Sequence, residues 1–296
     1  MTIKLGIIGL SEGNGHPYSW SAIFNGYNSI AMEECGYPVI PRYLEQQAWP
    51  DSQIKNAEVV AVWTQDSCLS HHIAQSSRIR YVVDYYEDMI GKVDAILLAR
   101  DDAQNHLRYA EPFLKAGLPI YIDKPIALSL EDLEKLYALE QYPGQIFTCS
   151  ALRFSQELML TEEDTQKIGK IKQITAFTPK SWKKYAVHII EPVLNMLPVY
   201  DVPVETLSPT VKDETGTLVV RWKSGIQTNF FALGEGVSPL SIRVCGTEGF
   251  VDLTFTDSFS AFKDALQAFV NGISIEKIAS KKSFNKQVVQ LLESGI

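Results

Sequence analysis

A glycine-rich turn near the N-terminus has the composition of a phosphate-binding cradle. The apolar segment 4–9 ends in glycine, a polar turn follows at 11–17, and a helical pattern occupies 18–30. Backbone N–H groups in such a turn can approach a pyrophosphate, and the positive end of the helix dipole adds to the attraction. The spacing departs from G-x-G-x-x-G, so the turn alone fits an ordinary strand-to-helix loop equally well. The residues expected to contact a dinucleotide are Gly9, Leu10, Ser11, Gly13, Asn14, Gly15 and His16.

The end of the second predicted strand offers a further contact for a dinucleotide. An acid at this place commonly binds the adenine ribose. Strand 58–63 is followed by Thr64 and then by Asp66. Asp66 is a candidate ribose ligand, and a solvated aspartate in a turn is an equally good interpretation. No arginine stands nearby for a 2′-phosphate, so the sequence does not choose between NAD and NADP.

Lys124 occupies a place where α/β proteins bind ligands. It follows the predicted strand 119–123, at the carboxyl end, within the turn Asp123-Lys124-Pro125. A lysine there can neutralise negative charge near a nicotinamide and orient a substrate hydroxyl. The alternative is a surface lysine that precedes a proline.

His188 is the best candidate for moving a proton. It lies in the segment 182–197, with Tyr185 three residues before it. Oxidation of a secondary alcohol needs a base for the hydroxyl proton as the hydride leaves, and a histidine suits this role near neutral pH. The alternative is a histidine packed at a domain junction.

The segment 94–133 resembles the signature region of the Gfo/Idh/MocA oxidoreductases, the family of glucose–fructose oxidoreductase and inositol dehydrogenase. That family shows a strand, a T-P-N-x-x-H-like turn, a helix ending in Ala-Gly, a strand, and then E-K-P or D-K-P. This chain has Ala99-Arg100-Asp101 in place of the usual turn and keeps His106, Ala116-Gly117 and the D-K-P turn. The resemblance implies that Lys124 contacts both cofactor and substrate, and that the cofactor pocket includes Arg100, His106 and Asp123.

The segment 182–197 resembles the family's substrate-domain helix, which opens with D-x-x-x-H. His188 matches the family histidine, Glu191 takes the place of an aspartate that often follows, and Lys184 stands where the family has Asp. A lysine cannot orient His188 or stabilise its protonated form, so Tyr185 is expected to share the work. Arg153 matches a family arginine that could bind a polar substrate or brace an interface. The expected catalytic residues are therefore Lys124, His188 and Tyr185, and the expected substrate contacts are Lys124, Arg153, Lys184 and His188.

The order of elements predicts two domains. Up to Pro125 strands alternate with helices, which indicates a parallel sheet. Afterwards strands dominate, at 171–177, 217–222, 226–233, 240–245 and 250–255. We therefore expect an α/β Rossmann-type N-terminal domain over 1–124 that binds a dinucleotide. An α+β C-terminal domain over 125–296, with a largely antiparallel open sheet, should bind substrate and form the oligomer contact.

Two segments carry further expectations. Residues 31–56 read as irregular, and their place at the amino ends of the strands predicts a packing or oligomer-contact role opposite the cofactor site. In the C-terminal sheet, the adjacent Phe230 and Phe231 must point to opposite faces. Helices of one domain can cover only one of these faces, so a homodimer or homotetramer through this sheet is expected.

Composition argues against several classes of partner. The net charge is −8 with no basic cluster, so neither nucleic acid nor an anionic membrane is an expected partner. The four cysteines are far apart, which indicates reduced thiols in a cytoplasmic protein and no metal site.

We therefore expect an NAD(P)-dependent oxidoreductase that transfers hydride between nicotinamide and a secondary alcohol or ketone of a sugar, cyclitol or related polyol. The substrate class follows from the resemblance alone. The alternative is a non-catalytic dinucleotide-binding sensor or corepressor-like relative. Lys184 and the altered first turn favour that alternative, whereas Lys124 and His188 disfavour it. NAD-using glycosidases also occur in this family, but no residue here singles that activity out.

Overall fold

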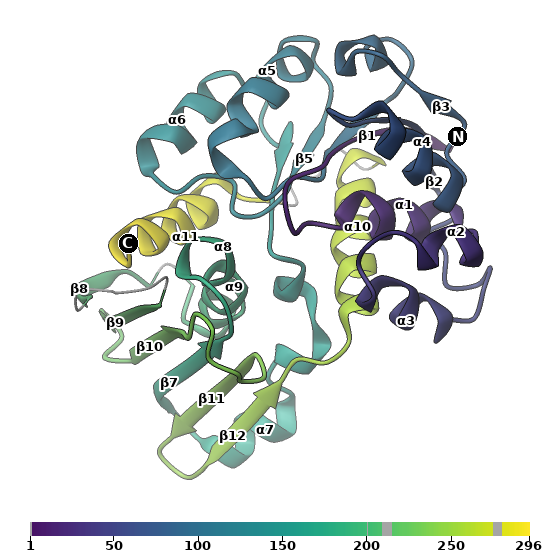
Figure 1. The fold of residues 1–296 in the computed structure, drawn as a ribbon. Coiled ribbons are helices and arrows are strands. Elements are labelled where there is room, and N and C mark those ends of the chain that lie inside the picture. The colour runs from purple at the N-terminus through teal and green to yellow at the C-terminus, as the bar shows by residue number, and fades with distance from the viewer. Residues whose placement is uncertain (1, 200, 209–214, 275–279) are drawn as a thin grey trace. The chain divides into compact units, whose positions relative to one another are not determined.

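The computed structural model describes residues 2–199, 201–208, 215–274 and 280–296. The chain forms two compact units, each built from segments that are separate in sequence (Figure 1). The first unit contains Met1–Ala127, Glu131–Cys149 and Phe262–Lys282. The second contains Leu128–Leu130, Ser150–Ala261 and Ser283–Ile296.

The predicted boundary at 124–126 lies close to the first crossing between the units, after Ala127. The chain then re-enters the first unit at Glu131 and again at Phe262, so a single domain boundary does not describe the two units. The functions expected of the two domains remain predictions.

A parallel six-stranded sheet forms the centre of the first unit. Its order is β3-β2-β1-β4-β5-β6, and every pair is parallel. The strands are β1 (Ile3–Ile8), β2 (Ala57–Trp63), β3 (Tyr81–Val82), β4 (Ala95–Leu98), β5 (Ile120–Ile122) and β6 (Ile146–Phe147). The strand order reverses between β1 and β4, and ligands of open α/β sheets bind at the carboxyl ends beside such a reversal. The Rossmann-type N-terminal fold is therefore confirmed.

Helices cover both faces of this sheet. Trp20 of α1 and Phe269 of α10 both contact Tyr121 of β5, so these helices share one face, while α5 and α6 lie together away from them (Figure 1). The helices are α1 (His16–Asn25), α2 (Ser29–Glu33), α3 (Val39–Glu45), α4 (Ser67–Ser76), α5 (His106–Lys115), α6 (Leu130–Ala138) and α10 (Ser258–Ser274).

The segment 31–56 is not irregular, because it contains the end of α2 and all of α3. Pro38 is the N-cap of α3 and Pro41 lies in its first turn, where a missing N–H is tolerated. The helix expected over 18–30 is likewise two helices, because it breaks at Gly26, whose φ is +70°. Part of the segment 31–56 also lies close to the phosphate turn, whereas the sequence placed the segment opposite the cofactor site. A Cβ on Gly15 would lie 2.6 Å from a side-chain atom of Ile40.

The second unit contains a separate six-stranded sheet of order β12-β11-β7-β10-β9-β8. Only the β7–β10 pair is parallel, so the expected largely antiparallel sheet is confirmed. The strands are β7 (Ile171–Thr178), β8 (Pro203–Leu207), β9 (Gly216–Trp222), β10 (Gln227–Ala232), β11 (Ser241–Gly246) and β12 (Phe250–Thr254). The helices that belong with it are α7 (Glu162–Ile168), α8 (Trp182–Tyr185), α9 (Val187–Met196) and α11 (Lys282–Ser294).

The two faces of this sheet differ in burial. Leu218, Val220 and Phe230 are fully buried on the face against which α8 and α9 pack. On the other face, Phe177 and Phe231 are only half-buried, and their rings stack with centroids 5.1 Å apart. The predicted alternation of the two phenylalanines is therefore confirmed. Within the described residues, no helix has the length and apolar character to cross a membrane.

Candidate active site

The turn after β1 is fixed by residues that follow β2 and β4. The Leu10 N–H donates to Gln65 Oε1 at 3.1 Å, and the Gln65 amide donates back to the Leu10 carbonyl at 2.8 Å. Arg100 donates to the same carbonyl at 2.9 Å. Gln65 was not expected as a site residue, since a neutral glutamine 55 positions away gives no sequence signal. These contacts hold the predicted cradle at the carboxyl edge of the sheet.

Asp123 gathers three residues of the candidate cofactor site. Its carboxylate is 1% exposed, accepts from the Asn14 amide at 2.8 Å and lies 2.6 Å from Nδ1 of His16. Its other oxygen accepts from the backbone N–H of Lys124. Burial alone would raise the pKa of Asp123. The charges of His16 and Lys124 and the hydrogen bonds from His16 and Asn14 outweigh this and lower the pKa to about 2. The cradle therefore rests on a buried charged carboxylate.

Lys124 follows β5 and lies close to an acidic residue that follows β4. Its Nζ is 3.7 Å from Oδ2 of Asp101, and both side chains are less than one-tenth exposed. Asp101 also accepts from the Ser11 hydroxyl at 2.7 Å and donates its backbone N–H to the Ser11 oxygen. The ammonium group thus lies close to the turn, and its contact with cofactor and substrate remains a prediction. Asp101, which was noted only as part of an altered turn, is the acid that holds it there.

Arg100 and His106 brace the loops around the cradle. The guanidinium of Arg100 makes two hydrogen bonds to Asp102 and lies 4.7 Å from the ring centroid of Tyr109. His106 is fully buried, with Nε2 2.7 Å from the Arg100 carbonyl and Nδ1 3.0 Å from the Ile126 carbonyl. Both neighbours are carbonyl acceptors, so the N–H of a neutral ring donates to one of them, and the ring lies between the two loops. These contacts fit the expected role of shaping the pocket.

Asp66 has a structural role in the described chain. One of its carboxylate oxygens accepts from the N–H groups of Cys68 and Leu69 and so caps α4. Thr64 hydrogen-bonds to the Asp66 carbonyl and to the Ser70 hydroxyl. These contacts favour the turn interpretation of Asp66, and the ribose contact remains a prediction.

In the second unit, Ser150 orients His188. The Ser150 hydroxyl oxygen lies 2.7 Å from Nδ1 of His188 and also accepts from the Leu152 N–H at 3.2 Å. The sequence left His188 without an orienting residue, because Lys184 replaces the family aspartate. The structure places Ser150 in that role, from 38 positions earlier in the chain.

A buried ion pair fixes the position of Ser150. Glu191 is 3% exposed, and one of its oxygens accepts from the Ser150 N–H at 2.9 Å and from Nε of Arg153 at 2.7 Å. Burial raises the pKa of the Glu191 carboxyl, and the positive charge and hydrogen bonds around it oppose that effect. Arg153 also lies over the Phe284 ring at 4.3 Å and donates to Asn285. Of the two roles expected for Arg153, these contacts favour bracing, and its contact with substrate remains a prediction.

Tyr185 has a lysine partner that the sequence did not single out. Lys180 donates to the Tyr185 hydroxyl at 2.5 Å and lies 4.4 Å from its ring centroid. The ring centroids of Tyr185 and His188 are 5.3 Å apart. The second unit thus brings together the predicted pair Tyr185 and His188 with Ser150, Glu191 and Lys180. The expected contact of Lys184 with substrate stays a prediction.

Comparison with known proteins agrees with this arrangement. Residues 35–150 match the model of an oxidoreductase family with an NAD-binding Rossmann fold. Myo-inositol 2-dehydrogenase from Lactobacillus plantarum superposes with a TM-score of 0.75 at 16% identity, over 99% of this chain and 96% of that one. Scyllo-inositol dehydrogenase from Lactobacillus casei, with bound NAD(H) and scyllo-inositol, gives 0.73 at 16% identity over the same shares. UDP-N-acetylglucosamine 3-dehydrogenase from Acidithiobacillus ferrooxidans gives 0.69 at 14%, over 99% and 96%. No curated protein matches the chain in sequence.

The fold and the family match together define an oxidoreductase with an NAD-binding Rossmann fold. Residues 35–150 match the model of the Gfo/Idh/MocA oxidoreductase family, which agrees with the resemblance seen in the sequence. The likeness to the solved structures, at these low identities, establishes the fold of the two units.

Proposed function

We propose that this protein is an NAD-dependent dehydrogenase or reductase. It would transfer hydride between the nicotinamide and a secondary alcohol or ketone of a sugar, cyclitol or related polyol. The observation that carries the proposal is the hydrogen bond between Nδ1 of His188 and the Ser150 hydroxyl. The backbone N–H of Ser150 is in turn bound to Glu191, which forms a buried ion pair with Arg153. The inositols and the nucleotide sugar named for the structural relatives support the substrate class.

The turn after β1 fits a dinucleotide phosphate. Gly13 has a φ of +76° and no atom within 4 Å of the place where a Cβ would lie, so its backbone is open to close approach. The start of α1 offers few N–H groups to a phosphate, because the His16 N–H is bonded to Asn14 and Pro17 has no N–H. The turn itself, over 9–16, would therefore hold the pyrophosphate. When bound, the nicotinamide would accept or donate the hydride.

His188 is suited to accept the hydroxyl proton. When its Nδ1–H donates to Ser150, Nε2 is the ring nitrogen that carries the lone pair, and a general base accepts a proton through such a lone pair. In the reverse reaction the protonated ring returns that proton to the forming alcohol. Tyr185, whose hydroxyl bonds to Lys180, is the second candidate for this transfer.

Lys124 is the candidate of the first unit for contact with a substrate. Its ammonium group stabilises negative charge that develops on the substrate oxygen as the proton leaves. Asp101 and Asp123 keep this charge in a nearly buried place, where an electrostatic interaction is stronger than in water.

A non-catalytic sensor is the second candidate, and Asp101 favours it. This carboxylate hydrogen-bonds to Ser11 inside the phosphate turn, where a second negative charge would weaken a pyrophosphate contact. Such a protein would bind the dinucleotide weakly and turn over no polyol.

Turnover with the wild type and three variants tests the proposal. NAD is supplied with myo-inositol, scyllo-inositol and a panel of aldoses, and formation of NADH is followed. Lys124→Ala and His188→Gln should each lower kcat by roughly 10²-fold. His188→Gln should change Tm little, whereas Lys124→Ala should lower Tm, because it removes the positive charge beside the buried Asp101 and Asp123. His71→Gln, at an exposed histidine on α4, is the matched control and should leave kcat unchanged. Dinucleotide binding without turnover of any of these alcohols would favour the sensor.

A further inference from the structure

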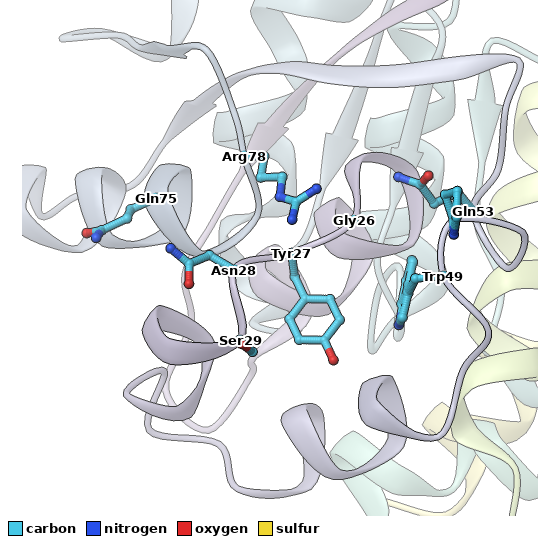
Figure 2. A pocket seen from close by; sticks show the side chains of 9 residues that line it. Gly26, Tyr27, Asn28, Ser29, Trp49, Gln53, Gln75 and Arg78 are labelled. Carbon is cyan, nitrogen blue, oxygen red and sulfur yellow. The ribbon is translucent and has the colours of Figure 1, made fainter.

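The first unit contains a pocket at the opposite end of α1 from the phosphate turn. It has a volume of about 500 Å³, within the range of small-molecule sites. Figure 2 shows the side chains that line it, chiefly Tyr27, Asn28, Trp49, Gln53 and Arg78. The helix between the two places has ten residues, which corresponds to a length of about 15 Å. The pocket is therefore separate from the dinucleotide cradle.

One wall of this pocket is aromatic. Tyr27 and Trp49 meet edge to face, with ring centroids 5.4 Å apart. The indole N–H of Trp49 donates to the Leu44 carbonyl at 2.8 Å, so the ring has only carbon surface left to offer. Both side chains are half-buried. This wall suits the face or edge of a flat ring.

Two hydrogen-bond donors converge beside Gly26. A Cβ built on this glycine would lie 3.1 Å from the amide nitrogen of Gln53 and 3.5 Å from a guanidinium nitrogen of Arg78. The Gln53 amide donates one hydrogen to the Phe24 carbonyl at 3.3 Å, and its NH₂ group has a second. The side chain of Arg78 extends toward the side of the pocket where Gln53 and Trp49 lie (Figure 2). Such a pair of donors is complementary to an anion.

Arg78 occupies a backbone position that would suit glycine. It follows the C-cap of α4 with a φ of +54°, in the left-handed region, where a side chain costs about 1 kcal/mol or more. Within the described part of the chain Arg78 forms no ion pair, and it is the only charged residue that lines the pocket. The chain as a whole carries a net charge of −8. A strained arginine at the edge of a neutral pocket points to a ligand that needs its charge.

We propose that this pocket binds a small planar carboxylate. The carboxylate would lie on Arg78 and Gln53, and the ring would lie against Tyr27 and Trp49. The site is independent of the proposed dehydrogenase reaction, because it shares no residue with the cradle, Lys124 or His188.

Calorimetry with benzoate tests the site on the full chain. Benzoate should bind with a Kd in the millimolar range or below, and benzamide, its neutral counterpart, should bind about tenfold more weakly or worse. Arg78→Gly should weaken benzoate binding by about tenfold or more while Tm stays equal or rises, since glycine accepts the left-handed backbone. Arg80→Gln, at an exposed arginine paired with Glu58, is the control and should leave the Kd unchanged.

Four results would overturn the proposal. They are the absence of benzoate binding at millimolar concentration, equal affinity for benzamide, unchanged affinity in Arg78→Gly, and displacement of benzoate by NADH. Displacement by NADH would place benzoate in the dinucleotide cradle. Trp49→Phe, which keeps an aromatic wall, should retain binding within about threefold, and it shows whether the ring contacts are made as proposed.

Discussion

Replacement of Asp123 by asparagine should remove a pH-dependent contribution to the stability of the first unit. The carboxyl is 1% exposed, and its pKa is lowered from 3.8 to about 2. Each pKa unit corresponds to about 1.4 kcal/mol, so the charged carboxylate contributes about 2.5 kcal/mol near neutral pH. The folded pKa lies below the unfolded one. This contribution is therefore complete above the unfolded value and is lost as the pH falls through the folded value.

The magnitude at intermediate pH follows from the two pKa values. By about pH 3 roughly half of the contribution should be gone. Urea unfolding of the wild type and Asp123→Asn, followed by tryptophan fluorescence, measures the difference in free energy of unfolding at each pH. Trp20 is a suitable reporter, because its ring stacks on His16 at 4.9 Å and on Tyr121 at 4.7 Å.

The control is the same pair of proteins in a His16→Gln background. The charge of His16 is the largest of the effects that lower the pKa of Asp123, so without His16 the difference should depend less strongly on pH. A wild-type difference that stays constant between about pH 7 and about pH 3 would refute the reasoning, because a buried charged carboxylate cannot lose its proton linkage.

Two further predictions concern the second unit. Ser150→Ala should lower kcat by about tenfold and alter its pH profile with little effect on KM, whereas Ser150→Thr should restore most of the rate, because only the hydroxyl that orients His188 is needed. A fall confined to KM would count against the orienting role. Phe231→Lys, on the half-buried face of the sheet, should convert an oligomer into a monomer in light scattering without loss of fold. A wild-type protein that scatters as a 33.2 kDa monomer at all micromolar concentrations would contradict an interface there.

Much of the fold could be predicted, because burial leaves a pattern in the sequence. The strands of the first sheet are short apolar runs bounded by glycine or polar turns. In the second sheet, β9 alternates between buried and more exposed residues. β8 was missed because its side chains are exposed or half-buried, with Val204 and Leu207 about 60% exposed, so it lacks a buried face to mark it.

The candidate site could be predicted only where a strand or helix end marks it. Lys124 follows β5 directly, so its place at the sheet edge was evident from the strand pattern. Ser150, Gln65 and Lys180 could not be found in this way. Each is a common polar residue, and the first two reach their partners across 38 and 55 positions of the chain. Only the folded chain brings such pairs together, and no spacing rule anticipates them.

A calorimetric titration with NADH and with NADPH tests the central claim most directly. We expect one dinucleotide for each chain and a Kd for NADH below about 1 mM. Gly13→Val should weaken this binding, because a side chain would block close approach to the turn. A folded protein that gives no binding heat with either dinucleotide at millimolar concentration would contradict both the dehydrogenase and the sensor.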